Sequence, residues 1–419
     1  MKKIRLPLIA LCALSACSAP ETSLPENAQN TKIEATVLDD VYQSRFAAYA
    51  AGNLSGLNLY DPLKAVAGAD NYTPFELSES QAISPDAIRA AINYLQDRRT
   101  TSFMIWHEGE LVAQKYFGDQ TPDGTINSRS LAKPLGVIAV GRAIKSGHIK
   151  SLDQPVSDFF HEWKTDDRSK ILVRHLLDMR TGLMMQTQEK DPNHVMNKAY
   201  LHPAHDQVII DEYPLINPPG SRYEYANANA ELVAPLIERA TGQQYEDWMT
   251  QEIFKPLGAK GGEVWMNRDG GTAHAGCCTL LPPETFFRLA ILYLNDGVWE
   301  GERLLPEGFV DQVKTGTPQY PYAGMGVYVA GDYIEARGPA NPDFPLGKTK
   351  HGEPYLAEDL FLFDGNGNQV AYIIPSANMV IFRSGTWPSQ ELGWDNAVLP
   401  NIILAGTNFP VGKKPVPQQ

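Results

Sequence analysis

Ser130 and Lys133 stand three residues apart in the segment SRSLAKPLGVIAVGRAI, at the start of an apolar helix pattern. Residues three apart lie on one face of a helix, so the hydroxyl and the amine can meet. At a helix start the hydroxyl also lies among unpaired backbone N–H groups, at the positive end of the helix dipole. Together with the lysine ammonium, these groups favour an activated serine nucleophile. A serine N-cap beside an exposed lysine is the alternative, because SxxK alone occurs by chance in many chains.

A second pair, Tyr225 and Asn227, lies between a Pro/Gly-rich loop and a helix pattern in NPPGSRYEYANANAELVAPLIERATG. A tyrosine close to a lysine ammonium can act as a proton relay, and Asn227 can hydrogen-bond the lysine and a substrate carbonyl. YxN alone is a weak signal, since Tyr293 begins another match in FFRLAILYLNDG. That match lies in an apolar helix pattern, so we interpret Tyr293 as core packing.

The two pairs belong to an ordered series: SRSLAK, SLDQPVSDFF, ILVRHLLDMRTGL, PPGSRYEYANANAELVAPLIERATG, IFKPLGAKGGEVW, LAILYLNDGVWEGERLLP and GNGNQVAYIIPSANMVIF. In this order the chain resembles the serine β-lactamase-related hydrolases over roughly residues 84–405. Class C β-lactamases, DD-peptidases and family VIII esterases belong here, and the 6-aminohexanoate-dimer hydrolase type is closest in pattern. The resemblance implies a β-lactamase/transpeptidase-like fold and an acyl-enzyme mechanism. Ser130 would attack a carbonyl, Lys133 and Tyr225 would transfer its proton, and Asn227 would support them.

The third motif of this family, Lys-Thr-Gly on a strand that lines the cleft, is where the sequence departs from the pattern. A literal KTG at Lys314 follows a helix pattern and precedes a Pro-rich loop, so we interpret it as a coincidence. The family's cleft lysine helps to bind a substrate carboxylate. Without it, esters or small linear amides are expected as substrates, and β-lactamase or DD-peptidase activity is the alternative.

The expected position of the third motif, before the strand VAYIIP, holds the glycine-rich stretch GNGNQ. Gly365 and Gly367 would allow the backbone to approach a substrate closely. By resemblance, the main-chain N–H groups of Ser130 and Asn366 would form an oxyanion hole. A plain hairpin turn is the alternative interpretation of this stretch.

No metal and no cofactor are expected, because neither HExxH nor paired CxxC occurs. Apart from Cys12 and Cys17 near the N-terminus, the cysteines are the adjacent Cys277 and Cys278. Adjacent cysteines can bridge only through a strained ring, so we expect no conventional structural disulfide. Both are interpreted as small buried apolar residues. His175, in the apolar run VRHLL, is interpreted as a core histidine.

The N-terminus has the layout of a lipoprotein signal peptide over residues 1–16. Its apolar run LPLIALCAL is too short to span a bilayer and ends in LSAC, which resembles a bacterial lipobox. Cys17 would then carry the lipid and become the mature N-terminus. Ser18 after this cysteine favours the outer membrane by resemblance, so a periplasmic lipid-anchored protein is expected.

The chain has 419 residues and a formal net charge of −13. Removing residues 1–16 removes three positive charges and no negative one, which leaves a net charge near −16. Nucleic acids and anionic lipid surfaces require clustered Lys and Arg, so neither is an expected partner. The expected partner is a small ester or amide, with membrane contact only through the lipid. A catalytically inactive periplasmic binding lipoprotein of the same fold is the non-enzymatic alternative.

Three segments are predicted along the chain: the signal peptide, a lipidated tether and lead-in over residues 17–83, and a hydrolase domain over 84–419. Ser84 and Pro85 open an amphipathic helix, and a hairpin is predicted around Gly109. Strand patterns return only late, so we expect an α/β (α+β) fold. Its antiparallel sheet would combine residues of about 84–125 and 320–410, flanked by helices, beside a mostly helical lobe. The catalytic cleft would lie between the two.

Overall fold

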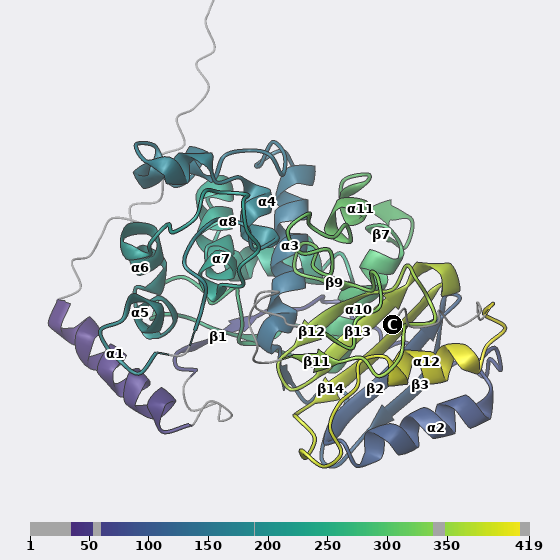
Figure 1. Ribbon diagram of the computed structural model, residues 1–419. Coiled ribbons are helices and arrows are strands. Elements are labelled where there is room, and N and C mark those ends of the chain that lie inside the picture. The colour runs from purple at the N-terminus through teal and green to yellow at the C-terminus, as the bar shows by residue number, and fades with distance from the viewer. Residues whose placement is uncertain (1–34, 53–59, 188, 338–347, 411–419) are drawn as a thin grey trace, which may run out of the picture.

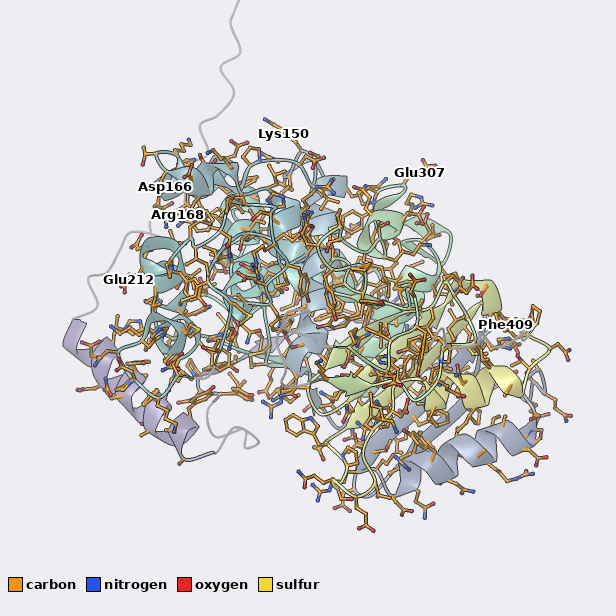
Figure 2. The ribbon with its side chains drawn as sticks, viewed as in Figure 1. Lys150, Asp166, Arg168, Glu212, Glu307 and Phe409 are labelled. Carbon is orange, nitrogen blue, oxygen red and sulfur yellow. A yellow bond between two sulfur atoms is a disulfide. The ribbon has the colours of Figure 1, made fainter. Side chains whose placement is uncertain are left out.

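The computed structural model describes residues 35–52, 60–187, 189–337 and 348–410. The predicted signal peptide, Cys17 and most of the tether lie outside this part of the chain. Two regions are evident in Figure 1, a sheet lobe on one side and a helical lobe on the other. Charged side chains such as Asp166 and Arg168 project from the outer surface of the helical lobe (Figure 2), where they form an ion pair of 2.7 Å. Within the described residues, no helix has the length and apolarity to cross a membrane.

The sheet lobe is built on a six-stranded antiparallel sheet of order β3-β2-β14-β13-β12-β9. Its strands are β2 (Thr100–His107), β3 (Glu110–Tyr116), β9 (Tyr328–Val329), β12 (Phe361–Gly365), β13 (Gln369–Ile374) and β14 (Met379–Gly385). β2 and β14 pair in the centre, with Ile105 opposite Ile381. The predicted union of N-terminal and C-terminal strands in one antiparallel sheet is therefore confirmed.

Alternating side chains of this sheet form two apolar layers. One face packs with α2 (Pro85–Gln96) and α12 (Val398–Ala405), and the other with α10 (Pro283–Leu294). α2 begins as predicted: Ser84 Oγ accepts a hydrogen bond of 3.2 Å from the backbone N–H of Ala87. Tyr293 of α10 is only 1% exposed and its hydroxyl donates to the carbonyl of Pro134 at 3.3 Å, so its role is core packing.

The helical lobe carries most of the short helices. They are α3 (Ala132–Lys145), α4 (Val173–Leu177), α5 (Val195–Leu201), α6 (His205–Glu212), α7 (Asn227–Glu231), α8 (Val233–Thr241) and α9 (Tyr245–Met249), with the 3-10 turns η5 (Val156–Asp158), η6 (His161–Trp163) and η7 (Asp167–Lys170) and the π-helical turn η8 (Thr250–Phe254). A four-stranded antiparallel sheet of order β1-β5-β6-β4 adjoins it: β1 (Leu63–Val66), β5 (Gly262–Trp265), β6 (Thr279–Leu281) and β4 (Ile126–Asn127). Smaller elements are α11 (Phe309–Val313), the pairs β7 (Val298–Trp299) with β8 (Glu302–Arg303) and β10 (Ala336–Arg337) with β11 (Thr349–Lys350), and η9 (Pro375–Ala377).

The folded body begins well before residue 84, the predicted start of the domain. α1 (Ala35–Ala50) lies against the helical lobe (Figure 1), and its Tyr42 is 1% exposed. The Arg45 guanidinium donates to the carbonyls of Leu201 and Asn267 at 3.2 and 3.0 Å. β1 pairs with β5. Much of the predicted lead-in is therefore part of the fold.

Cys277 and Cys278 correct a second prediction. Both side chains are buried, at 7% and 0% exposure, as expected for small core residues. Their sulfurs, however, are joined in a disulfide between adjacent residues. The prediction excluded a conventional structural disulfide, and the bond here is the exception, an eight-membered ring between neighbours. The interpretation of the two residues as separate apolar side chains is therefore corrected.

Candidate active site

Ser130 lies in the 3-10 turn η4 (Arg129–Leu131), which leads directly into α3. Ser128 stabilises the turn, because its carbonyl accepts a hydrogen bond from the Leu131 N–H at 3.0 Å. Ser128 also exchanges backbone hydrogen bonds with β6, donating to the Thr279 carbonyl at 2.9 Å, while its Oγ accepts from Thr279 N–H at 3.0 Å. Arg129, just before the serine, has a φ of 49°, a conformation that non-glycine residues adopt only when their surroundings hold them there.

Four predicted side chains meet at this turn. Ser130 Oγ lies 2.8 Å from Tyr225 Oη and 3.2 Å from Lys133 Nζ. Lys133 Nζ also donates to Asn227 Oδ1 at 2.9 Å and lies 4.8 Å from the centre of the Tyr225 ring. The structure thus brings together two pairs, Ser130 with Lys133 and Tyr225 with Asn227, and the pairs are about 95 residues apart in sequence.

The lysine is held by one partner that no motif predicted. Lys133 Nζ donates to the carbonyl of Gly276 at 2.8 Å. With Ser130 Oγ and Asn227 Oδ1 this makes three acceptors, which is the number of N–H groups on an ammonium. Lys133 is only 7% exposed, whereas Ser130 is half-buried. Lys133 is therefore fixed inside the protein, and the serine it touches is partly open to solvent.

Gln186 is a second residue that sequence reasoning missed. Its side-chain carbonyl accepts from the backbone N–H of Asn227 at 2.9 Å, and its backbone N–H donates to the Tyr225 carbonyl at 3.1 Å. Both motif residues of the second pair are therefore anchored by one residue of a distant loop. A lone glutamine in a loop carries no spacing signal that could have shown this role.

The glycine-rich stretch lies directly beside the serine turn. A Cβ placed on Gly365, the last residue of β12, would be 3.1 Å from Leu131 Cγ and 3.2 Å from Leu131 N. Gly365 pairs with Gln369, whose side chain donates to the Asn127 carbonyl at 2.7 Å. The stretch is thus a tight hairpin, as one interpretation held, and its Gly365 packs against Leu131 of the turn that carries Ser130.

Asn366 and Gly367 form the tip of this hairpin. Asn366 directly follows Gly365, the residue that packs against Leu131 of the serine turn. Gly367 has a φ of 88°, and its carbonyl accepts from the buried Arg383 guanidinium at 2.7 Å. That bond fixes the tip to β14, so the hairpin presents a rigid backbone to the site.

A cavity of about 550 Å³ lies at the β9 edge of the sheet, and Tyr322, Arg337 and Tyr355 are among its lining residues. Arg337 is 1% exposed, and its guanidinium binds Asp364, the neighbour of Gly365, at 2.6 Å. This size is sufficient for a small organic ligand. Arg337, one of the buried cations near the third motif, is thus neutralised by a carboxylate, whereas Arg383 donates to the backbone carbonyls of Gly367 and Asn368.

Lys314 and His175, for which no catalytic role was predicted, each have a structural partner of their own. Lys314 follows α11 and forms an exposed ion pair of 3.0 Å with Asp311. His175 is buried, and its Nδ1 accepts from the backbone N–H of Leu172 at 3.3 Å. Burial, together with Arg180 and Arg174, lowers the pKa of His175 to about 4. It is therefore a neutral core histidine at physiological pH.

One buried polar cluster escaped the sequence analysis: His205, Glu231 and His274, all 0% exposed. Glu231 Oε2 lies 3.4 Å from His274 Nδ1 and 3.6 Å from His205 Nε2. Burial acts to raise the pKa of Glu231, but the two imidazoles outweigh it and hold the carboxyl ionised. Burial lowers the pKa of His274 to about 4.

These three residues are of types that bind metals, yet their arrangement does not suit one ion. The two imidazoles stack, with centroids 4.1 Å apart and planes 13° from parallel. A metal must lie near the plane of each ligating ring, about 2.0–2.1 Å from its nitrogen. Two stacked planes share no such point. The geometry fits a buried carboxylate flanked by two imidazole N–H groups.

Comparison with known proteins agrees with this architecture. The Beta-lactamase family model matches residues 88–290. The 6-aminohexanoate-dimer hydrolase of Paenarthrobacter ureafaciens is 25% identical over 361 residues, which cover 82% of this chain and 87% of that protein. A Bacillus anthracis structure provisionally named 6-aminohexanoate-dimer hydrolase has a TM-score of 0.64 at 18% identity, covering 85% of this chain and 93% of that one. EstCE1, a hydrolase with promiscuous acyltransferase activity, has a TM-score of 0.58 at 14% identity, covering 77% and 97%. The predicted β-lactamase/transpeptidase-like fold and the resemblance are confirmed.

Proposed function

We propose that this protein, a relative of the serine β-lactamases in fold and motif order, is an envelope-anchored serine hydrolase that cleaves esters or small linear amides through an acyl-enzyme. One observation carries the proposal: Ser130 Oγ lies between Tyr225 Oη at 2.8 Å and Lys133 Nζ at 3.2 Å. A serine hydroxyl with a proton acceptor within hydrogen-bond reach is the arrangement that nucleophilic catalysis requires.

Acylation follows from this geometry. Ser130 Oγ bonds to the substrate carbonyl carbon while its proton passes to the Tyr225 and Lys133 pair. The carbonyl oxygen takes up the negative charge, and the backbone N–H groups of Ser130 and Asn366 stabilise it. The C–O or C–N bond then breaks, and the leaving alcohol or amine takes the proton. Water, deprotonated by the same pair, cleaves the serine ester and restores the hydroxyl.

The substrate class rests on charge. GNGNQ supplies backbone donors and amides where the related enzymes that bind a carboxylate carry a lysine. Two buried cations lie near this stretch, and both are engaged: Arg337 by Asp364 at 2.6 Å, and Arg383 by the carbonyls of Gly367 and Asn368 at 2.7 and 2.9 Å. Neutral esters and short amides are therefore better substrates than molecules that depend on a carboxylate contact. An amide hydrolase and a hydrolase with acyltransferase activity among the relatives agree with this choice.

Anchoring at the envelope rests on the sequence alone, through LSAC and Cys17. Metabolic labelling with a fatty-acid analogue tests it, since wild-type protein should take up label and fractionate with membranes. A Cys17→Ser variant that is labelled and fractionated equally would contradict the anchor and leave the catalytic proposal untouched.

The catalytic proposal is tested by a fluorophosphonate probe and a substrate screen. Wild-type protein should be labelled stoichiometrically, and Ser130→Ala should not. p-Nitrophenyl esters, short ω-amino amides and nitrocefin then separate esterase or amidase activity from β-lactamase activity. An unlabelled wild-type protein would support a catalytically inactive binding lipoprotein in place of an enzyme.

A further inference from the structure

The segment Gly276–Thr279 forms hydrogen bonds both to Lys133 and to the turn that carries Ser130. At one end, the Gly276 carbonyl accepts from Lys133 Nζ at 2.8 Å. At the other end, the Thr279 carbonyl accepts from the backbone N–H of Ser128 at 2.9 Å, and the Thr279 N–H donates to Ser128 Oγ at 3.0 Å; Ser128 lies two residues before Ser130. The distance between these two anchors therefore influences how Lys133 and the serine turn lie relative to each other.

The two residues between the anchors are Cys277 and Cys278, and they are joined by a disulfide. The pair is closely packed. Tyr200 Oη lies 3.3 Å from Cys277 Sγ and 3.6 Å from Cys278 Sγ, and the Cys278 carbonyl accepts from Trp265 N–H at 3.2 Å. Cys278 has a φ of 68°, in the left-handed region that non-glycine residues rarely adopt.

We propose that the Cys277–Cys278 disulfide is a redox-dependent positioning element of the active site, and that its reduction lowers turnover. The inference rests on the proposed serine hydrolase function and adds a regulatory group to it. The disulfide does not touch the reacting atoms; it acts through the Gly276 carbonyl on Lys133 and through Thr279 on the Ser130 turn.

Reduction has a definite chemical course. A thiolate of an external dithiol attacks one sulfur of the pair and forms a mixed disulfide, while the other sulfur leaves as a thiolate and is protonated. The second thiol of the reductant then closes its own disulfide and releases the other cysteine. The protein gains two electrons and two protons, and the dithiol is oxidised.

The steric consequence follows from packing. Two sulfurs that are no longer bonded must separate to van der Waals distance, on the order of 3.5–4 Å. At 7% and 0% exposure, the cysteine side chains have no open space into which they can move. Because protein interiors are close-packed, the backbone of the loop must adjust instead. Gly276 has little freedom of its own, since a Cβ there would be 2.8 Å from Glu231 Oε1.

The proposed envelope location agrees with this role, because disulfides form and persist in the oxidising periplasm. The oxidised form is then the working form of the enzyme, and a loss of oxidising capacity would reduce its activity.

The experiment compares oxidised, dithiothreitol-reduced and re-oxidised full-length protein, with the gain of two thiols confirmed by titration. Reduction should lower kcat by about tenfold or more, corresponding to about 1.4 kcal/mol of barrier. KM for a p-nitrophenyl ester should change less than twofold, and re-oxidation should restore kcat. A Cys277→Ser/Cys278→Ser double variant, whose two hydroxyl oxygens cannot bond covalently and must separate as the free thiols do, should show the low kcat permanently and not respond to dithiothreitol.

Tyr200→Phe is the matched control, since it removes the hydroxyl beside both sulfurs and leaves the disulfide intact; its kcat should stay at the wild-type value. Full kcat in the reduced protein, or in a folded double variant, would overturn the inference. If the double variant does not fold, the reduced wild type decides. Fluorophosphonate labelling of the oxidised protein distinguishes the redox proposal from the proposed serine hydrolase function. If the probe labels Ser130 but kcat does not depend on the redox state, only the redox proposal is refuted.

Discussion

The proton of Ser130 has two possible first acceptors, Tyr225 Oη at 2.8 Å and Lys133 Nζ at 3.2 Å. Lys133 already has Asn227 Oδ1 and the Gly276 carbonyl as acceptors for its own N–H groups. Its geometry is that of an ammonium that stabilises charge. Tyr225 is therefore the better placed of the two for direct proton transfer.

Replacing Ser130 with alanine should abolish acylation without unfolding the protein. The hydroxyl contacts Lys133 and Tyr225 and does not cap α3, so its removal leaves the packing of the helix intact. Tm should stay within about 4 °C of wild type, the shift expected for about 1 kcal/mol in a domain of this size. Calorimetry and fluorophosphonate labelling measure the two effects. Turnover by the alanine variant at a comparable rate would show that the nucleophile lies elsewhere.

Two Tyr→Phe variants form a matched pair. Tyr225→Phe should lower kcat by about 10²–10⁴-fold, because it removes a proton-transfer hydroxyl. Tyr293→Phe should leave kcat almost unchanged, since that hydroxyl donates to the Pro134 carbonyl in the core at 3.3 Å. Steady-state kinetics on one ester is enough to rank them. The opposite ranking would mean that the second motif has been placed on the wrong tyrosine.

At this scale the sequence predicted the residues whose types carry the chemistry, and the structure brings Ser130, Lys133, Tyr225 and Asn227 together. It could not predict Gly276, which contributes a backbone carbonyl, because every residue has one. The imidazoles beside Glu231 were also missed, since they come from separate segments and only the fold makes them neighbours.

Among the elements, the contact between β12 and the turn η4 has the most direct bearing on catalysis. A Cβ on Gly365 would lie 3.1 Å from Leu131 Cγ and 3.2 Å from Leu131 N, inside ordinary contact distance. Gly365→Ala should therefore displace the serine turn and lower kcat by about tenfold or more, with a stability cost of about 1–3 kcal/mol for overpacking.

Gly124→Ala is the control for that substitution, because the nearest atom to its Cβ is the flexible end of the Gln120 side chain. Kinetics and thermal unfolding of both variants measure the effect. Equal kcat values for the two would show that the hairpin does not constrain the nucleophile.

Elements with a strong local signal were predicted well, as α2 and the β2–β3 hairpin show. β1 was missed because it is four residues long and is defined by pairing with β5, almost 200 residues away. The disulfide was missed for a related reason: its geometry depends on a backbone conformation at Cys278 that the loop imposes and the spacing does not reveal.

For the molecule as a whole, the absence of a lysine from the third-motif stretch GNGNQ predicts which substrates it prefers. A lysine contact to a carboxylate is about twice as strong as a neutral hydrogen bond, and the third motif lacks it. Short-chain esters and linear amides should therefore exceed penicillins and cephalosporins in kcat/KM. Lys314→Ala should leave kcat/KM unchanged for every substrate, because Lys314, directly after α11, pairs with Asp311 of that helix. Nitrocefin turnover that exceeds ester turnover and disappears in Lys314→Ala would reverse this conclusion.

Stability should depend on pH through buried neutral histidines. The pKa of His175 is lowered from 6.5 to about 4, so the unfolded chain takes up its proton first as pH falls. Its contribution is complete above pH 6.5 and is lost as pH falls from 6.5 towards 4. The decline of Tm over that range should be smaller in His175→Gln than in wild type. Identical slopes in calorimetry would show that the pKa of His175 is not lowered in the folded protein.

The central pairing of β2 with β14 also determines when the molecule can fold. Residues such as His107 and Met379 face each other from opposite ends of the chain, so closing the sheet requires a very long loop and loses the corresponding chain entropy. Until β14 is available for pairing, the apolar β2–β3 hairpin has an unpaired edge, and such edges recruit other chains. Closing the sheet lobe should therefore be a late step in folding, and partly folded chains should be prone to aggregate through the exposed edge of β2.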